Sequence, residues 1–295
     1  MDQAQQKRLL QVLLVSIPYF LWCTYLVEAR PEHYVMYIAV VTCYLATEKT
    51  RIWVYNFAGL IMYWVVYDSL RICPNYKINP VHISEPYLFD KQWFGITTEA
   101  GRQTLNEFFA TRTTTALDIT TALFYLSWLP VPILFGTWLI FRDKILFRQF
   151  MYGFLCTNLI GFVLYYLYPA APPWYVELNG FVFNPDTGRS AAGLERFDQL
   201  IGKPFFHNMY QRNSNVFAAI PSLHSAYPLI TLFYARQVPQ RWPTVLFVFL
   251  SLGIWFSAVY LRHHYVIDVI LGALTAVAGY ILARWVFRLI QPNQQ

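Results

Sequence analysis

The chain has 295 residues and a formal net charge of +6; 57% of its residues are hydrophobic, 19% are aromatic and only 13% are charged. Soluble domains usually contain about 25% charged residues, and a soluble core could not bury this much apolar surface, whereas lipid solvates it directly. The composition excludes intrinsic disorder, a collagen-like repeat and a disulfide scaffold, and it predicts an all-α, polytopic membrane helical bundle.

Eight apolar segments are predicted to be membrane helices. The first is long and lacks a small-residue cleavage site, so we expect a retained span rather than a signal peptide. The second and third are short and could instead form one re-entrant hairpin, which would leave the remaining topology unchanged. The segments are 9–27, 34–47, 52–67, 117–141, 149–168, 218–235, 243–261 and 265–287.

The distribution of Lys and Arg predicts that both termini are cytoplasmic. The short inner segments then carry eleven basic residues, and the short outer loops carry only Arg30 and Arg262. The other nine basic residues lie in two long outer loops, 68–116 and 169–217. We leave them out of the count that sets the orientation, because an active-site loop needs charges of its own. The positive charge therefore indicates topology, and no nucleic-acid partner is expected.

The chain is expected to divide into accessory spans at 1–51 and a six-helix catalytic membrane domain at 52–290. Within the first long outer loop, a helix could lie on the membrane surface with Trp93 and Phe94 dipping into it. A folded lid packed on the bundle is the alternative.

Two short histidine motifs lie where apolar segments begin. Residues 221–224 (PSLH) open the sixth segment, and residues 262–265 (RHHY), followed by Asp268, open the eighth. Both segments run from outside to inside in the predicted topology, so their N-termini should meet at one membrane face. Helix N-termini offer free N–H groups and a positive dipole end, which suit a phosphate.

The spacing assigns roles to these residues. His264 and Asp268 are four residues apart on one helix face, so the carboxylate can hold the imidazole in one tautomer and leave its other nitrogen free to attack. His263 has Ile267 at that distance and lacks such a partner. His224 is expected to protonate the leaving oxygen and then to activate the acceptor.

Other interpretations stay open. A histidine near a membrane interface can be structural, and Asp268 can be a carboxylate favoured by the helix dipole. His263, His264 and Asp268 could bind a metal, although adjacent histidines point in different directions on a helix. We expect neither a metal nor another cofactor.

The PSLH motif, with His264 and Asp268, resembles the second and third signatures of the type 2 phosphatidic-acid phosphatase superfamily. The resemblance implies a six-helix core and metal-independent lipid phosphatase or phosphotransferase activity through a phosphohistidine. A narrower similarity, good over about 165–275, is to its inositol phosphorylceramide synthase branch, the aureobasidin-resistance type. It rests on four stretches: 168–175 (YPAAPPWY), 193–202 (GLERFDQLIG), 217–225 (FAAIPSLHS) and 260–265 (YLRHHY).

The wider superfamily's first signature is absent near Pro169, and Ala258 stands where the third has arginine. The branch shares both losses, so other groups must bind the phosphate. Arg196 fits the branch motif and is the first candidate, and Arg262 lies two residues before His264. Lys203, Arg189 and Arg212 remain open.

The other predicted substrate-binding residues flank these motifs. Trp174 and Tyr175 follow two prolines and could grip a lipid head group or simply form an aromatic belt. The remaining two are Ser222 and His263.

The resemblance implies transfer of a phospho-head group, such as inositol phosphate from phosphatidylinositol, to a lipid hydroxyl such as that of ceramide. A lipid phosphate phosphatase would use the same residues with water as acceptor, and a lipid transporter or binding protein is the alternative of another class. The expected partners are the donor phospholipid, the acceptor lipid and the surrounding membrane, and whether a protein partner binds is left open. We expect a bacterial inner membrane with the active site on its periplasmic face.

Overall fold

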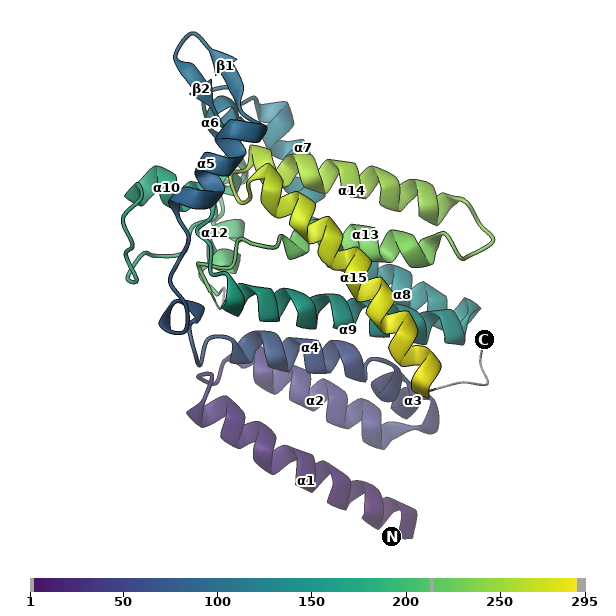
Figure 1. The fold of residues 1–295 in the computed structure, drawn as a ribbon. Coiled ribbons are helices and arrows are strands. Elements are labelled where there is room, and N and C mark those ends of the chain that lie inside the picture. Colours follow the sequence, from purple (N-terminus) through teal and green to yellow (C-terminus); the bar gives the residue numbers. More distant parts are fainter. Residues whose placement is uncertain (1–2, 213–214, 291–295) are drawn as a thin grey trace. The chain divides into compact units, whose positions relative to one another are not determined.

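The computed structural model describes residues 3–212 and 215–290, most of which are helical (Figure 1). This part of the chain divides into two compact units, one ending at Pro74 and the other beginning at Asn75. The boundary expected between residues 51 and 52 lies inside the first unit and stays a prediction.

The first unit consists of four helices. The third apolar segment is split between two of them, which meet at Phe57. The helices are α1 (Gln3–Tyr25), α2 (Pro31–Ala46), α3 (Glu48–Asn56) and α4 (Ala58–Ser69).

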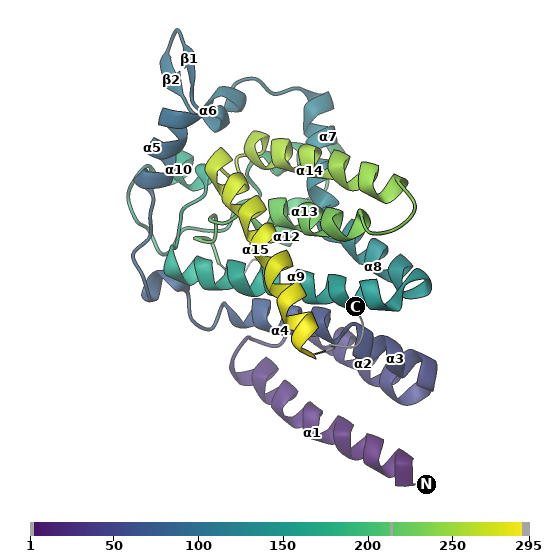
Figure 2. The same cartoon turned by 45° about the vertical axis from the view of Figure 1, so that its right-hand side comes forward.

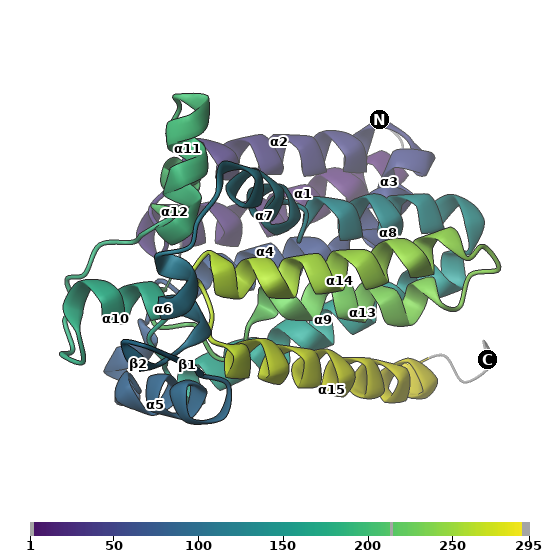
Figure 3. The same ribbon diagram turned by 90° about the horizontal axis from the view of Figure 1, so that it is seen from above.

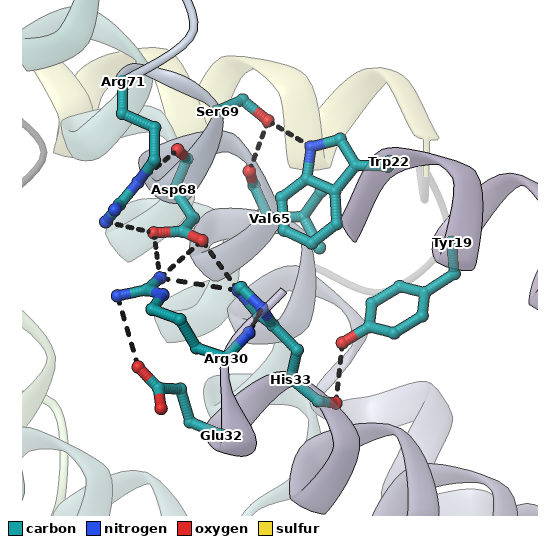
Figure 4. A network of polar contacts seen from close by, with 9 residues as sticks. All are labelled: Tyr19, Trp22, Arg30, Glu32, His33, Val65, Asp68, Ser69 and Arg71. Atoms are coloured by element: carbon teal, nitrogen blue, oxygen red, sulfur yellow. Dashed lines mark hydrogen bonds and ion pairs between the residues drawn. The ribbon is translucent and has the colours of Figure 1, made fainter. Parts of the chain in front are cut away.

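A buried polar cluster ties the α1–α2 loop to the end of α4 (Figure 4). The Asp68 carboxylate accepts from Arg30 at 2.6 Å, from His33 Nε2 at 2.8 Å and from Arg71 at 2.7 Å. His33 Nδ1 in turn accepts from the backbone N–H of Arg30 at 3.0 Å. Both nitrogens of His33 are therefore occupied, and this second histidine–aspartate pair is a structural clamp with no free nitrogen for catalysis.

The second unit contains the histidine motifs. Its longest helices, α9, α14 and α15, run beside α13, and the short elements α5, α6, α10, β1 and β2 gather near the end where α15 begins (Figures 1–3). Its elements are η1 (Asn75–Lys77), α5 (Ser84–Trp93), β1 (Ile96–Thr98), β2 (Gly101–Gln103), α6 (Leu105–Ala110), α7 (Thr115–Leu126), α8 (Pro130–Arg142), α9 (Lys144–Leu167), α10 (Pro173–Asn179), η2 (Ala192–Leu194), α11 (Glu195–Ile201), α12 (Phe205–Tyr210), α13 (Leu223–Ala235), α14 (Trp242–Tyr260) and α15 (Val266–Ile290).

Four described helices, α1, α9, α14 and α15, are long and apolar enough to cross a membrane. A fifth candidate span is the pair α7 and α8, which are bent by 42° at their junction. The break precedes Pro130, whose ring cannot continue the α7 hydrogen-bond pattern. The chain is an integral membrane protein, while the count of eight spans and their orientation remain predictions.

Two glycines bring α15 close to its neighbours. A Cβ added at Gly272 would lie 2.1 Å from the Ser222 carbonyl oxygen, and one added at Gly279 would lie 2.1 Å from Thr157 Oγ1 of α9. Side chains at these positions would push α15 away from the start of α13 and from α9. The glycines therefore permit the close approach of the two histidine motifs.

The segment predicted to be the first long outer loop contains α5, the β1–β2 hairpin and α6. Leu88, Phe89 and Trp93 of α5 are exposed, whereas Asp90 is buried against α15. This helix combines an apolar outer face, as a surface helix would have, with packing on the bundle, as a lid would have.

Candidate active site

The first turns of α13 and α15 are fastened together. The Ser222 N–H donates to the Asp268 carbonyl at 3.0 Å, and Ser225 Oγ donates to the Val269 carbonyl at 3.1 Å. Ser222 is fully buried and caps α13, since its Oγ accepts from the Ser225 N–H at 3.3 Å. These contacts bring motifs 40 residues apart in the sequence to one place, as the topology predicted.

His264 is held by a backbone carbonyl through one ring nitrogen and faces His224 with the other. Its Nδ1 donates to the Ala219 carbonyl at 3.0 Å, and Asp268 Oδ2 lies 3.5 Å from the same nitrogen. The proton on Nδ1 leaves a lone pair on Nε2, which lies 3.4 Å from His224 Nδ1. The nearer orienting partner is thus a backbone carbonyl, and the Asp268 carboxylate adds its charge beside it.

Asp268 also organises its own helix. It is fully buried, and its Oδ2 accepts from the Tyr265 N–H at 2.9 Å, so the side chain caps the first turn of α15. The two interpretations of Asp268, an orienter of His264 and a helix-start carboxylate, are therefore both compatible with its contacts.

His263 lies in an aromatic stack. Its ring is 5.1 Å from that of Tyr125 and 4.7 Å from that of Tyr210, with interplanar angles of 9° and 19°. Burial, together with the nearby His264, lowers the pKa of His263 well below its usual value. His263 is therefore neutral at pH 7. The ring of Tyr125 also stacks on that of His224, with 4.7 Å between the ring centroids.

The three histidines line one cavity of about 80 Å³. One water needs roughly 10–15 Å³ by this measure, so the cavity has room for several waters or for a phosphoryl group. Arg189 is the one described cation in its lining, and its Nε has no partner within the described chain. The other lining residues include Trp174, Ser190, Tyr210, Asn215 and Ala219.

Other predicted substrate-binding residues lie outside this lining. Arg196 donates from Nε to Asp118 Oδ1 at 2.8 Å, and the Tyr260 hydroxyl donates to the same oxygen at 2.8 Å. Arg262 pairs with Glu177. Arg196 and Arg262, the two arginines that the sequence favoured most, are therefore each paired with a carboxylate. Their role in binding substrate stays a prediction.

Of the remaining predicted substrate-binding residues, some line the cavity and others do not. Trp174 lines the cavity, but the buried Tyr175 points its hydroxyl at the following loop, where it donates to the Val182 carbonyl at 2.9 Å. Lys203 is exposed after α11. No local motif surrounds Arg189 or Asn215, so sequence reasoning could not have ranked them above the other loop residues.

Asp90 of α5 also contacts the first turn of α15. Its Oδ1 accepts from the Ile267 N–H at 3.1 Å, which adds a second carboxylate to the first turn of α15. Burial, and to a lesser extent the charge of Asp268, raises the pKa of Asp90 from 3.8 to about 7.

Asp90→Asn is expected to stabilise the protein above pH 7 and to leave its stability unchanged near pH 4. Because the raised pKa lies in the folded state, the folded chain loses stability as pH rises from about 4 to about 7, by on the order of 4 kcal/mol for three pKa units. Asparagine keeps an oxygen for the Ile267 N–H but cannot ionise. Thermal unfolding in detergent at pH 4.5 and pH 8.5 measures this, with the exposed Asp186→Asn as control. Equal pH dependence in Asp90→Asn and wild type would contradict the assignment.

Comparisons with known proteins match this region to one family. The family model described as PAP2 superfamily matches residues 92–282, which include every predicted site residue. The chain is 39% identical over 281 residues to the phosphoinositol dihydroceramide synthase of Bacteroides thetaiotaomicron, covering 94% of this chain and 91% of that protein. No solved structure matches significantly.

Two fungal proteins match over shorter stretches. The inositol phosphorylceramide synthase of Candida albicans is 33% identical over 182 residues, covering 59% of this chain and 37% of that protein. The inositol phosphorylceramide synthase catalytic subunit of Saccharomyces cerevisiae is 35% identical over 130 residues, covering 43% and 31%. These matches confirm the resemblance that the motifs indicated.

Proposed function

Since the chain belongs to the PAP2 superfamily and to its inositol phosphorylceramide synthase branch, we propose that it transfers phosphoinositol from a phospholipid to the hydroxyl of a ceramide-type lipid. The observation that carries the mechanism is the contact between His264 Nε2 and His224 Nδ1, with His264 Nδ1 bound to a carbonyl. One imidazole is thereby held ready to attack, and a second lies within reach of the reacting group.

The first step forms a phosphohistidine. His264 Nε2 attacks the phosphorus, an N–P bond forms, and the P–O bond to diacylglycerol breaks. His224 supplies the proton that the leaving oxygen requires. The entering phosphoryl group displaces the contact between the two rings, so that His224 faces the oxygens of the bound group.

The second step releases the product. The acceptor hydroxyl loses its proton to His224 and attacks the phosphorus, and the N–P bond to His264 breaks. Both histidines return to their starting protonation states. Asp268 and the Ala219 carbonyl, which lie beside Nδ1, stabilise the imidazole when it carries positive charge.

Arg189 is our choice for neutralising the phosphate. Its side chain lines the cavity of the histidines with Nε unpartnered. Arg196 and Arg262 each already bind a carboxylate, which reduces the charge that they can offer.

Arg189→Gln is expected to lower kcat by about 10²–10³, the range seen when one donor to a developing oxyanion is removed. Arg189→Lys keeps the charge and should retain part of the rate, although it cannot bind two oxygens in one plane. Steady-state transfer rates in mixed micelles measure the effect, and the exposed Arg112→Gln on the outer side serves as a charge-matched control. If Arg189→Gln had the wild-type kcat, Arg189 would not be the residue that binds the phosphate.

Purified protein with phosphatidylinositol labelled in its head group, with and without ceramide, tests the function. Ceramide-dependent transfer of the label supports the proposal. Release of soluble labelled head group or phosphate would indicate a phosphatase instead. If there were no turnover, a lipid transporter or binding protein would be the remaining alternative. Loss of activity in EDTA that a divalent metal restores would contradict the metal-independent scheme.

We further propose that both termini are cytoplasmic, that the catalytic domain begins near residue 52 and that the active site faces the periplasm of a bacterial inner membrane. The positive-inside count supports the orientation. Single cysteines introduced at Gln5 or in the β1–β2 hairpin of a variant whose four native cysteines, including the exposed Cys73, are replaced by serine test it. With a membrane-impermeant reagent on intact cells, only the hairpin site should react.

A further inference from the structure

Two aromatic side chains contact the ring of His224. The Tyr125 ring stacks on it, with 4.7 Å between the centroids and 23° between the planes. The Trp128 ring stands nearly perpendicular to it, at 4.9 Å and 76°. Tyr125 belongs to the last turn of α7, and Trp128 lies in the break between α7 and α8. The junction of these two bent helices therefore supplies both rings.

Hydrogen bonds hold His224 less firmly than they hold His264. The His264 ring bonds to the Ala219 carbonyl at 3.0 Å and lies beside Asp268. For the His224 ring, the one hydrogen-bonding contact within the described chain is that to His264 Nε2, at 3.4 Å. In the scheme above, the entering phosphoryl group displaces this contact. During the reaction, the aromatic contacts are then what fixes the plane of the His224 imidazole.

Trp128 is itself held in place by Tyr227. The two rings stack with 5.1 Å between the centroids and 21° between the planes, and Tyr227 lies three residues after His224 on α13. The Tyr227 hydroxyl donates to Asn158 Oδ1 of α9 at 2.6 Å, and both side chains are buried. Trp128 is therefore tied to the helix that carries His224, and that helix is tied to α9 at the same level.

Tyr125 contributes its ring rather than its hydroxyl. The side chain is 1% exposed, and the hydroxyl has no hydrogen-bond partner within the described chain. The ring stacks on both His224 and His263. A tyrosine face attracts a cation within about 6 Å, and His224 carries positive charge before it gives its proton to the leaving oxygen. The Tyr125 ring therefore suits both the orientation and the charge of a general acid.

We propose that Tyr125 and Trp128 are positioning residues for His224: their rings keep its Nδ1 facing the reacting oxygen after the contact with His264 has been displaced. The inference rests on the function proposed above, in which His224 protonates the leaving oxygen. A misplacement of about 1 Å can cost about 10²-fold in rate. Loss of either ring should thus slow the steps that need His224 and spare the attack by His264.

Tyr125→Leu and Trp128→Leu remove the rings and keep apolar side chains. With phosphatidylinositol as donor, we expect each to lower kcat by about 10²-fold with the donor KM little changed. Tyr125→Phe keeps the ring and should recover most of the rate. The matched control is Phe135→Leu on α8, which should have the wild-type kcat: Phe135 is 4% exposed, and its ring contacts those of Phe150 and Phe247.

A second donor separates positioning from general damage to the fold. In a synthetic phosphoinositol donor with a nitrophenolate leaving group, the first step needs no proton from His224. We expect Tyr125→Leu and Trp128→Leu to release the first equivalent of nitrophenolate at close to the wild-type rate. A variant that disturbs the packing as a whole would displace His264 too and slow both donors by the same factor. The amplitude of this burst counts the folded, active protein, so partial unfolding lowers the amplitude and leaves the rate unchanged.

A double-mutant cycle with His224→Asn gives the third readout. Without an imidazole to position, Tyr125→Leu and Trp128→Leu should cause little further loss of kcat, so the effects should be strongly non-additive. Trp128 gives the cleaner cycle because, among the described rings, it contacts those of His224 and Tyr227 and not that of His263. Equal slowing of both donors, an unchanged kcat with phosphatidylinositol, or a full further loss in the His224→Asn background would overturn the proposal.

The same measurements distinguish this inference from the proposed function. If the wild type passes the labelled head group to water and not to ceramide, the proposed transfer is wrong, and the comparison of the two donors still measures the positioning of His224. Transfer to ceramide with both donors slowed equally in Tyr125→Leu and Trp128→Leu would leave the function standing and overturn the positioning roles. No turnover of either donor by the wild type would overturn both.

Discussion

Replacing His264 with asparagine is expected to abolish both lipid transfer and labelling of the protein from the phospholipid donor. Asparagine places an N–H near the position of Nδ1, where it can still donate to the Ala219 carbonyl, but it has no nucleophilic nitrogen in place of Nε2. In the proposed scheme the whole reaction passes through the N–P bond, so we expect kcat to fall by at least about 10⁴, into the range lost when a covalent nucleophile is removed.

Labelled donor, followed by denaturation and gel electrophoresis at alkaline pH, measures this result. A phosphohistidine is stable in base and labile in acid, so the wild-type label should disappear after acid treatment. His263→Asn is the neighbouring control: its ring lies in the tyrosine stack, and the variant should still form the labelled intermediate. Base-stable label on His264→Asn would show that another residue is the nucleophile.

Replacing His224 with asparagine is expected to lower kcat by about 10²–10⁴, the usual contribution of a positioned general acid and base. Unlike His264→Asn, this variant keeps the nucleophile and loses only the proton donor for diacylglycerol. A synthetic phosphoinositol donor with a nitrophenolate leaving group needs no proton at departure. We therefore expect His224→Asn to form the phosphoenzyme from this donor at close to the wild-type rate, and then to transfer it slowly to the acceptor.

A stopped-flow measurement of nitrophenolate release separates the two steps. The expected trace for His224→Asn is a burst of one equivalent followed by a slow phase. If the burst is slowed as much as the steady state, His224 acts on the first step in some way other than by donating a proton.

The sequence predicted the membrane class and the convergence of His224, His264 and Asp268, because spacing along a helix and the direction of two spans are both visible in the sequence. It could not predict the Ala219 carbonyl beside His264 Nδ1, since any residue type supplies a carbonyl and the contact spans 45 positions. For the same reason, the partner of Arg196 could not be predicted from the sequence. Its pairing with Asp118, 78 residues away, depends on tertiary packing that no local motif encodes.

The break between α7 and α8 shows a second limit. The apolar run at 117–141 predicts one helix, but Pro130 ends the hydrogen-bond pattern of the first half, and the pair bends by 42°. Proline can kink a helix or end it, and the choice depends on the neighbours that receive the freed backbone groups.

The bond from the Ser222 N–H to the Asp268 carbonyl also governs when during biosynthesis the enzyme can become active. Ser222 and His224 leave the ribosome before α14, whereas His264 and Asp268 leave after it, so the nascent chain at first carries only one of the two histidines. Only when α15 has inserted and Gly272 has met the start of α13 do the two imidazoles face each other. A chain interrupted before residue 264 therefore lacks His264 and Asp268, so the two imidazoles can meet only after most of the chain has been made.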